Sequence, residues 1–181
     1  MLRQARPAIL LTIAFTVLTG IVSHNDWFVT LLSAAGDPDI KDELKAGRDL
    51  NGTTYRVHLD GHDQLDYLTG AADASPRVHF FYVSDDGDLT AMRYDNWKVV
   101  FLEQRAQGTL QVWLEPFTEL RIPKIFNLRT DPYERADITS NTYYDWLLDH
   151  AFLMVPAQAY VGQFLMTFKD YPQRQKAASF N

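Results

Sequence analysis

The sequence predicts an α+β fold in which a small antiparallel sheet of about four strands packs against a long C-terminal helix. Short apolar and aromatic runs between residues 78 and 128 alternate with turn-forming residues, as expected of consecutive antiparallel strands. Between residues 143 and 168, apolar residues recur at helical spacing, which predicts a helix with a broad apolar face. A second helical pattern, over residues 26–35, precedes the strands and adds an N-terminal helix to this arrangement.

Composition narrows the classes of protein to which the chain can belong. Of the 181 residues, 46% are apolar and 13% are aromatic, which suits a globular chain with a core of its own. The net charge is −6 and the basic residues are scattered, so we expect no nucleic-acid partner. The chain has no cysteine, which excludes disulfides, thiolate metal sites and a cysteine nucleophile.

The N-terminus, residues 1–19, is a candidate targeting segment. Arg3 and Arg6 precede Ala8–Leu18, which are eleven mostly apolar residues, in the order of a secretory signal. This run is shorter than the roughly 20 apolar residues of a transmembrane helix, and Leu18-x-Gly20 is a poor cleavage site. An export signal, a membrane anchor and an untargeted start therefore all stay open, as do a periplasmic or exported, a membrane-anchored and a cytoplasmic location.

Residues 20–36 predict a capped helix. Ser23, Asn25 and Asp26 stand where a helix N-cap is wanted, and Gly36 ends the helix. His24 and Asp26 are residue types that can serve as a general base and the carboxylate that orients it. The start of a helix explains both residues better.

Residues 37–68 predict a short polar helix capped by Asp39, a turn at Asn51-Gly52 and a strand at Thr54–Leu59. The segment around this strand also holds the most metal-like cluster of the chain, formed by His58, Asp60, His62 and Asp63. Imidazole and carboxylate groups are ligands of Zn²⁺. Because Asp60-Gly61 is a turn signal, side chains on its two sides need not converge, and a surface turn explains the cluster better.

Strands joined by tight turns are predicted at Val78–Val83, Leu89–Arg93 and Trp97–Leu102. Thr109–Leu114 is expected to extend this sheet, and the stretch that begins at Lys124 supplies a further short strand up to Leu128. The chain then turns at Asp131-Pro132, where Pro132 fixes φ and Asp131 can bond to the backbone two residues on.

The C-terminal helical pattern runs from Tyr143 to Phe168. Thr142 and Asp145 form a variant of the capping box at its start. Pro156 should kink the helix or split it in two, because proline lacks the backbone N–H and clashes with the preceding turn. His150 lies among apolar residues, and we expect it to be a core histidine.

Four segments follow a known motif order along the chain. They contain Ser23, Asp26, Thr30, Leu31, Leu32, Ala34, Ala35 and Gly36 in the first segment; Asp60, Gly61 and Leu68 in the second; Ala91, Met92, Arg93, Asp95, Trp97 and Lys98 in the third; and Ile125, Phe126, Asn127, Leu128, Asp131, Pro132 and Glu134 in the fourth. Together and in this order they resemble the type I sulfatases (the arylsulfatase family), in which a proline usually stands where this chain has Val29.

The resemblance implies the C-terminal part of such an enzyme. Residues 20–70 would be a remnant of the family's α/β domain, and residues 71–181 its C-terminal subdomain. Full-length members hydrolyse sulfate esters with a formylglycine, made from the Cys or Ser of C-x-P-x-R or S-x-P-x-R, and a divalent metal such as Ca²⁺. Ser75-Pro76-Arg77 has the wrong register for that motif. We therefore expect no catalytic, cofactor-binding or metal-binding residue in this chain, and a sulfate-ester substrate only in a full-length relative.

Two functions of different class follow, with a truncated gene product as the third alternative. The first is the C-terminal part of an arylsulfatase-like sulfuric ester hydrolase, inactive in isolation. The second is a non-catalytic binding or assembly module, tethered to a membrane if Ala8–Leu18 is an anchor. A helix without most of its sheet should expose an apolar face near Val17, Trp27 and Leu31, through which the chain could self-associate.

Overall fold

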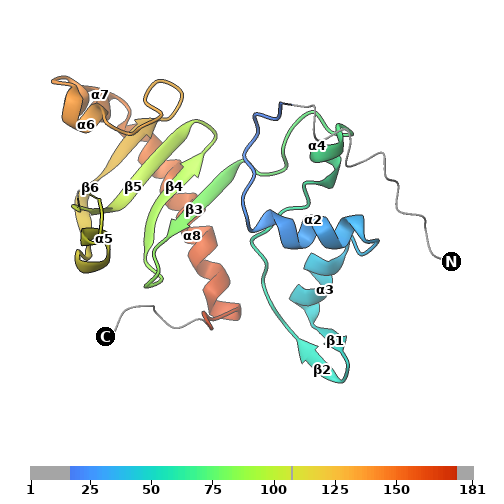
Figure 1. The fold of residues 1–181 in the computed structure, drawn as a ribbon. Coiled ribbons are helices and arrows are strands. Elements are labelled where there is room, and N and C mark those ends of the chain that lie inside the picture. The colour runs from blue at the N-terminus through green and yellow to red at the C-terminus, as the bar shows by residue number, and fades with distance from the viewer. Residues whose placement is uncertain (1–16, 107, 175–181) are drawn as a thin grey trace. The chain divides into compact units, whose positions relative to one another are not determined.

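The computed structural model describes residues 17–106 and 108–174, and most of the predicted apolar segment Ala8–Leu18 lies outside them. The chain divides into two compact units, residues 1–78 and 79–181, which are described separately (Figure 1). The division falls eight residues after the boundary expected at residues 70/71. Residues 71–78 stay with the first unit because Ser75 and Arg77 bind Gln64 and Asp26 there.

The first unit is built of short helices and one hairpin. Its elements are α2 (Asp26–Ala34), α3 (Ile40–Ala46), β1 (Arg48–Leu50), β2 (Thr53–Tyr55) and α4 (Leu65–Thr69). Val29, Ile40 and Leu44 form its buried apolar cluster, so α2 and α3 pack on each other. The predicted strand Thr54–Leu59 is shorter than expected, because the Val57 backbone N–H donates to the Leu44 carbonyl instead of extending the ladder.

The second unit holds an antiparallel sheet of four strands in the order β3-β4-β5-β6, which confirms the α+β prediction. The strands are β3 (His79–Val83), β4 (Leu89–Tyr94), β5 (Trp97–Gln104) and β6 (Phe117–Asn127). Consecutive strands are neighbours throughout. The turn Ser84–Asp88 joins β3 to β4, and the Ser84 and Asp88 backbones bond to each other across it.

The fourth strand differs from the prediction. Thr109–Leu114 does not extend the sheet; it forms a turn followed by α5 (Gln111–Leu114). Gly108 and Thr109 have φ values of 91° and 60°, a left-handed turn that ends extended backbone. The Gln104 side chain holds the turn by donating to the Val112 carbonyl at 2.7 Å. The fourth strand is instead β6, which begins at Phe117.

The C-terminal helical pattern is split, but not by its proline. A short helix, α6 (Ala136–Thr139), precedes the pattern, which forms α7 (Tyr143–Asp149), η1 (Ala151–Leu153) and α8 (Met154–Asp170). The break falls at His150, and Pro156 is the third residue of α8, where the backbone N–H has no partner in its own helix. The predicted capping box is absent, because the Thr142 side chain lies 3.2 Å from the Ser140 hydroxyl instead of capping α7.

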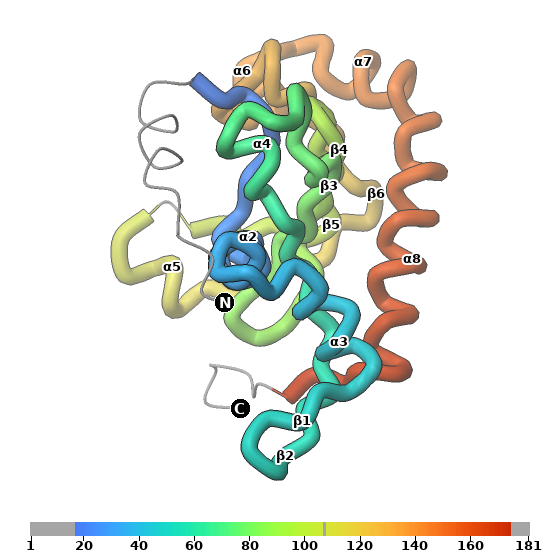
Figure 2. Tube along the Cα trace, turned by 90° about the vertical axis from the view of Figure 1, so that its right-hand side faces the viewer, coloured from blue at the N-terminus to red at the C-terminus, as the bar shows by residue number. Residues whose placement is uncertain are grey.

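Helices α7 and α8 cover one face of the sheet (Figure 2). Ile125 and Met92 of the sheet meet Leu147 and Ala157 of the helices in the buried core, and the Phe81 and Phe164 rings stack at 4.3 Å. The stretch Ala151–Asp170 is long and apolar enough to span a membrane by length and composition alone. Ala157 is the one buried residue of α8, and Val155, Leu165 and Met166 on the same helix are 70%, 50% and 64% exposed.

We predict that Ile125→Ala lowers the free energy of unfolding by about 2–5 kcal/mol, because Ile125 is fully buried and its loss leaves a cavity. Ile122→Ala is the matched control, since Ile122 lies in the same strand and is 58% exposed; its cost should stay below about 1 kcal/mol. Urea denaturation followed by circular dichroism measures both. An equal loss of unfolding free energy in Ile125→Ala and Ile122→Ala would show that the buried side of β6 does not anchor the core.

Candidate functional site

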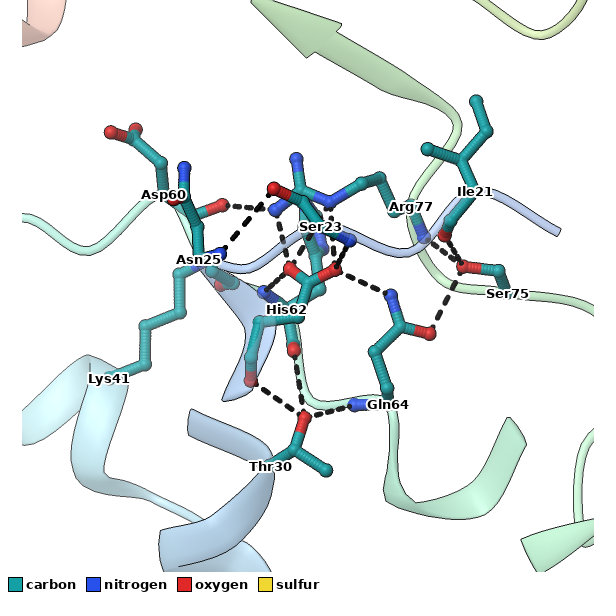
Figure 3. A network of polar contacts seen from close by, with 12 residues as sticks. Ile21, Ser23, Asn25, Thr30, Lys41, Asp60, His62, Gln64, Ser75 and Arg77 are labelled. Atoms are coloured by element: carbon teal, nitrogen blue, oxygen red, sulfur yellow. Dashed lines mark hydrogen bonds and ion pairs between the residues drawn. The ribbon is translucent and has the colours of Figure 1, made fainter. Parts of the chain in front are cut away.

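A buried polar network in the first unit is the strongest concentration of chemistry in the described chain (Figure 3). Its centre is the carboxylate of Asp26, which is 1% exposed, and the guanidinium of Arg77, which is 5% exposed. Gln64 beside them is fully buried. The three residues come from the start of α2, the segment before α4 and the segment before β3.

The start of α2 places the carboxylate. Asp26 follows Ser23 by three residues, and its Oδ2 accepts a bond of 2.8 Å from the Ser23 backbone N–H, which is one half of a capping box. The Asn25 backbone N–H lies 3.4 Å from the Ser23 hydroxyl. Asn25, the residue before α2, makes no side-chain cap bond, and Ser23 and Asp26 instead close the turn that precedes the helix. This turn also directs the Asp26 side chain toward the interior of the unit.

Arg77 neutralises this carboxylate. Its Nε lies 3.1 Å and 3.0 Å from the two oxygens of Asp26, and its Nη2 also donates to Oδ1. The same Nη2 donates to the Asp60 carbonyl at 2.9 Å. One guanidinium thus joins the start of α2 to the loop that contains Asp60, as a planar fork of donors can.

Amide groups also donate hydrogen bonds to the Asp26 carboxylate, and a hydroxyl group lies next to them. The Gln64 side chain donates to Asp26 Oδ2 at 3.0 Å, and the His62 backbone N–H donates to Oδ1 at 2.8 Å. Ser75 Oγ lies 3.1 Å from the Gln64 side-chain oxygen and 2.6 Å from the Ile21 carbonyl. Every polar group of this buried centre therefore has a partner, as low-dielectric surroundings require.

The pKa of Asp26 reflects this arrangement. Burial alone would raise the pKa, because it disfavours the charged form. The hydrogen bonds from Arg77, His62 and Ser23 and the positive charge of Arg77 outweigh burial, and they lower the pKa from its ordinary 3.8 to about 2. Asp26 is therefore ionised at neutral pH, and its oxygens are already bound, so it is poorly suited to accept a proton.

Gly61 lets the loop approach α2 closely enough for these bonds. A Cβ at Gly61 would lie 2.2 Å from the Asn25 carbonyl oxygen, which no side chain tolerates. The adjacent Lys41 side chain donates to the Gly61 carbonyl at 2.7 Å. Residues 56–64 contain no hydrogen-bonded turn, so the turn predicted at Asp60-Gly61 is absent, and glycine is required at residue 61 by close packing.

The residues that sequence patterns offered for chemistry do not assemble a site. The donors to Asp26 do not include the His24 ring, so those two residues form no base–orienter pair in the described structure. His58 lies 3.3 Å from Asp60, and the Asp63 side chain accepts from the Leu65 backbone N–H. Within residues 17–106 and 108–174, no three His, Asp or Glu side chains are placed to hold a metal.

Arg77 is the residue that sequence reasoning missed. In the sequence it stands in Ser75-Pro76-Arg77, whose register rules out a formylglycine motif, and no other local pattern marks it. Its partner Asp26 lies 51 residues earlier, and local patterns carry no information on such a pairing. The available signal was the spacing of Ser23 and Asp26, which turns a carboxylate inward and so requires a cation.

A second group of charges braces the sheet of the other unit. Lys98 of β5 bonds to both oxygens of Glu134 at 2.7 Å and 2.8 Å, and its ammonium lies 4.4 Å from the centre of the Tyr82 ring. Lys124 of β6 binds Asp137 at 2.6 Å. Burial alone would lower the pKa of Lys124, but its bonds to carboxylates raise it.

Apolar side chains remain exposed on α2. Trp27 is 45% exposed, Phe28 is 53% exposed and Leu31 is 62% exposed, and Val17 ahead of the helix is 90% exposed. Val17, Trp27 and Leu31 are the residues near which the sequence predicts an apolar face, and Phe28 is a further exposed residue of the helix. We refer to Trp27, Phe28 and Leu31 as the α2 apolar face.

Comparison with known proteins relates this chain to a protein family. The sequence profile of a family described as the C-terminal region of aryl-sulfatase matches residues 74–176. Among solved structures, the crystal structure of the PsFucS1 sulfatase from Pseudoalteromonas sp. is similar over 86% of this chain, with a TM-score of 0.61 and 24% identity. At that identity the likeness shows the fold. The chain spans 28% of the length of that protein. No curated protein matches the chain.

We predict that the Asp26 carboxylate contributes about 2 kcal/mol of pH-dependent stability, from the difference between 3.8 and about 2 in its pKa. Because the folded-state pKa is the lower one, this stability is complete above about pH 5 and is lost as the pH falls toward about 2. The advantage of the wild type over Asp26→Asn in urea denaturation should therefore shrink by about 2 kcal/mol over that interval.

Asp73→Asn, which removes one exposed carboxylate from the same unit, controls for the change in net charge. An advantage over Asp26→Asn that stays constant down to about pH 2 would mean that Arg77 does not hold the carboxylate ionised.

Proposed function

The chain belongs to the sulfatase family, whose C-terminal aryl-sulfatase region it contains, and on that premise we propose that it is a non-catalytic structural part of a sulfuric ester hydrolase. Its role would be to pack against, and so complete, the domain that carries the family's nucleophile and metal. The observation that carries this proposal is the Asp26–Arg77 network, in which the most perturbed carboxylate of the described chain serves to join loops.

Chemical requirements support the same proposal. Hydrolysis of a sulfate ester needs a nucleophile, a proton donor for the leaving group and cationic groups that stabilise charge on the sulfuryl oxygens. The chain has no cysteine, and the hydroxyl of Ser75 lies between the Ile21 carbonyl and the Gln64 side chain. Arg77 faces Asp26, so its charge is already compensated. Lys98 and Lys124 are likewise engaged by carboxylates.

The alternative is a non-catalytic binding or assembly module in its own right. The α2 apolar face favours an assembly role, because side chains such as Trp27 and Leu31 are costly to leave in water. The DNA upstream of codon 1 distinguishes the two. A reading frame there that encodes C-x-P-x-R or S-x-P-x-R favours a sulfatase part, and unrelated sequence favours the module.

We predict that the purified 181-residue chain hydrolyses an aryl sulfate no faster than background, with or without added Ca²⁺. A chromogenic aryl sulfate followed by absorbance measures this. Turnover that survives repurification and disappears in the double variant His58→Ala, Asp60→Ala would contradict the proposal. That result would assign catalysis to the histidine–aspartate cluster of residues 58–63.

We also predict that the isolated chain self-associates through the α2 apolar face when its larger partner domain is missing. Replacing Trp27 and Leu31 by serine should lower the average mass in sedimentation velocity, because it removes exposed apolar surface. Ile138→Ser, at a residue of the other unit that is 76% exposed, is the control and should leave the mass unchanged. A wild type that is monomeric at high concentration would contradict the prediction.

A further inference from the structure

Helix α8 is apolar on the side that faces away from the sheet as well as on the side that packs against it. Met154, Ala157 and Val161 contribute to the core of the second unit from one side of the helix. The sequence has no Asp, Glu, Lys or Arg from residue 151 to residue 168, so the other side is uncharged too. A helix that is apolar all round is expected to be buried on every side. The exposed side of α8 therefore calls for a partner.

Four exposed residues line this side of α8 at regular spacing, and we refer to them as the α8 outer face. They are Val155, Ala159, Gly162 and Met166, which are four, three and four residues apart. This is the spacing of the positions through which two helices make contact along their length. Ala159 and Gly162 in the middle are small, so another helix can approach closely there. A Cβ at Gly162 would meet no atom within 4 Å, which leaves this approach open.

Charged residues of opposite sign lie at the two ends of this uncharged stretch. Asp145 and Asp149 of α7 precede it, and both are exposed. Lys169 and Arg174 follow it, and Asp170 is the acidic residue between them. Figure 2 shows α7 at one end of α8 and the C-terminal turn of α8 at the other. A surface with negative charge at one end and net positive charge at the other is complementary to a second copy of itself turned end to end.

The spacing and the charges agree on one antiparallel register. If a two-fold axis passes between residues 160 and 161, Val155 meets Met166 of the second copy, and Ala159 meets Gly162 of the second copy. Lys169 then lies within about one helical turn of Asp149 of the second copy. A parallel pair would instead place Lys169 beside Lys169 of the second copy. Antiparallel pairing also brings the positive end of each helix dipole to the negative end of the other.

A lipid surface fits the α8 outer face less well than a second copy does. Helices that lie on membranes are usually rich in Lys and Arg on their polar face, and residues 151–168 contain neither. Anionic lipids attract basic segments, whereas this chain has a net charge of −6 and acidic residues at one end of the helical segment. The pattern of charge therefore favours a protein partner of matching charge.

We propose that the α8 outer face is a dimer interface, at which α8 pairs antiparallel with α8 of a second copy of this chain. A helix of 17 residues is about 25 Å long and about 10 Å wide, so the contact is smaller than the about 800 Å² per partner of a standard interface. The dimer is therefore weak, with a Kd on the order of micromolar. This inference goes beyond the proposed function and does not depend on it, because it rests on α7 and α8 alone.

The absence of cysteine from the chain makes cross-linking a direct test. Val155→Cys and Met166→Cys are made in separate 181-residue chains, both with Trp27→Ser and Leu31→Ser to remove the α2 apolar face. The two chains are mixed, oxidised with copper phenanthroline and digested, and mass spectrometry identifies the linked peptides. Ile138→Cys, at an exposed residue of α6, measures cross-linking by random collision.

We expect a disulfide between residues 155 and 166 in the mixture and little cross-linking of either chain alone. In the antiparallel register, two copies of residue 155 are displaced by 11 residues, about 16 Å along the helices, which is too far for a disulfide. Disulfides that join residue 155 to itself as readily would indicate a parallel pair and overturn the proposal. Mixed cross-linking no faster than that of Ile138→Cys would also overturn it.

Sedimentation velocity provides a second readout that needs no cysteine. The chain with Trp27→Ser and Leu31→Ser should be a dimer well above the Kd. Adding Ala159→Glu should shift it to the monomer, because two like charges then meet in the middle of the pair. Ile138→Glu adds the same charge outside the interface and should leave the dimer intact. Circular dichroism of each variant verifies the fold.

Two results would overturn the proposal in solution. One is an equal shift toward the monomer in Ala159→Glu and Ile138→Glu, which would place the contact elsewhere. The other is a monomeric chain that binds phosphatidylcholine vesicles and loses this binding in Ala159→Glu, which would assign the α8 outer face to a lipid surface.

Discussion

The bond between Asp26 and Arg77 is the constraint on which the first unit depends. The two charges are almost fully removed from water, and each is costly to bury without the other. Their positions fix three segments at once, because Asp26 also binds the His62 backbone and Arg77 binds the Asp60 carbonyl. The apolar cluster of this unit is small, built on Val29, Ile40 and Leu44. Polar bonds therefore define loop positions that apolar packing alone would leave open.

The second unit is also held by an ion pair, between Lys98 and Glu134, and the free energy needed to bury this pair is smaller. Lys98 and Glu134 belong to two segments that resemble the sulfatase motifs, and in the structure they bind each other. Glu134 has a φ of 54°, a left-handed conformation that non-glycine residues rarely adopt. The ion pair holds it there, and the Asp131 carboxylate binds the backbone N–H groups of Arg135 and Ala136 that follow. These residues, which carry the resemblance to the sulfatase motifs, thus have a structural role in this chain.

Sequence reasoning succeeded where a feature is determined locally. The helix at Asp26–Ala34 and the strands β3, β4 and β5 follow from spacing and turn residues, so their positions were predicted closely. It failed at residues 109–114, where a left-handed turn at Gly108 and Thr109 overrides strand propensity. It also missed the role of Arg77, because that role depends on a partner 51 residues away. Long-range pairing of this kind leaves no local pattern to read.

Charge and apolar surface are distributed in an unusual way in this chain, and the distribution bears on its role. Its buried ionic groups are compensated internally, whereas large apolar side chains such as Trp27, Phe28 and Leu31 are left outside. A self-sufficient monomer tends toward the reverse, with charges on the surface and few large apolar patches. In the first unit, the polar bonds around Asp26 and Arg77 would let the unit hold its shape. The exposed apolar residues of α2 need a further partner. That combination supports the proposed role as a part that completes a larger enzyme.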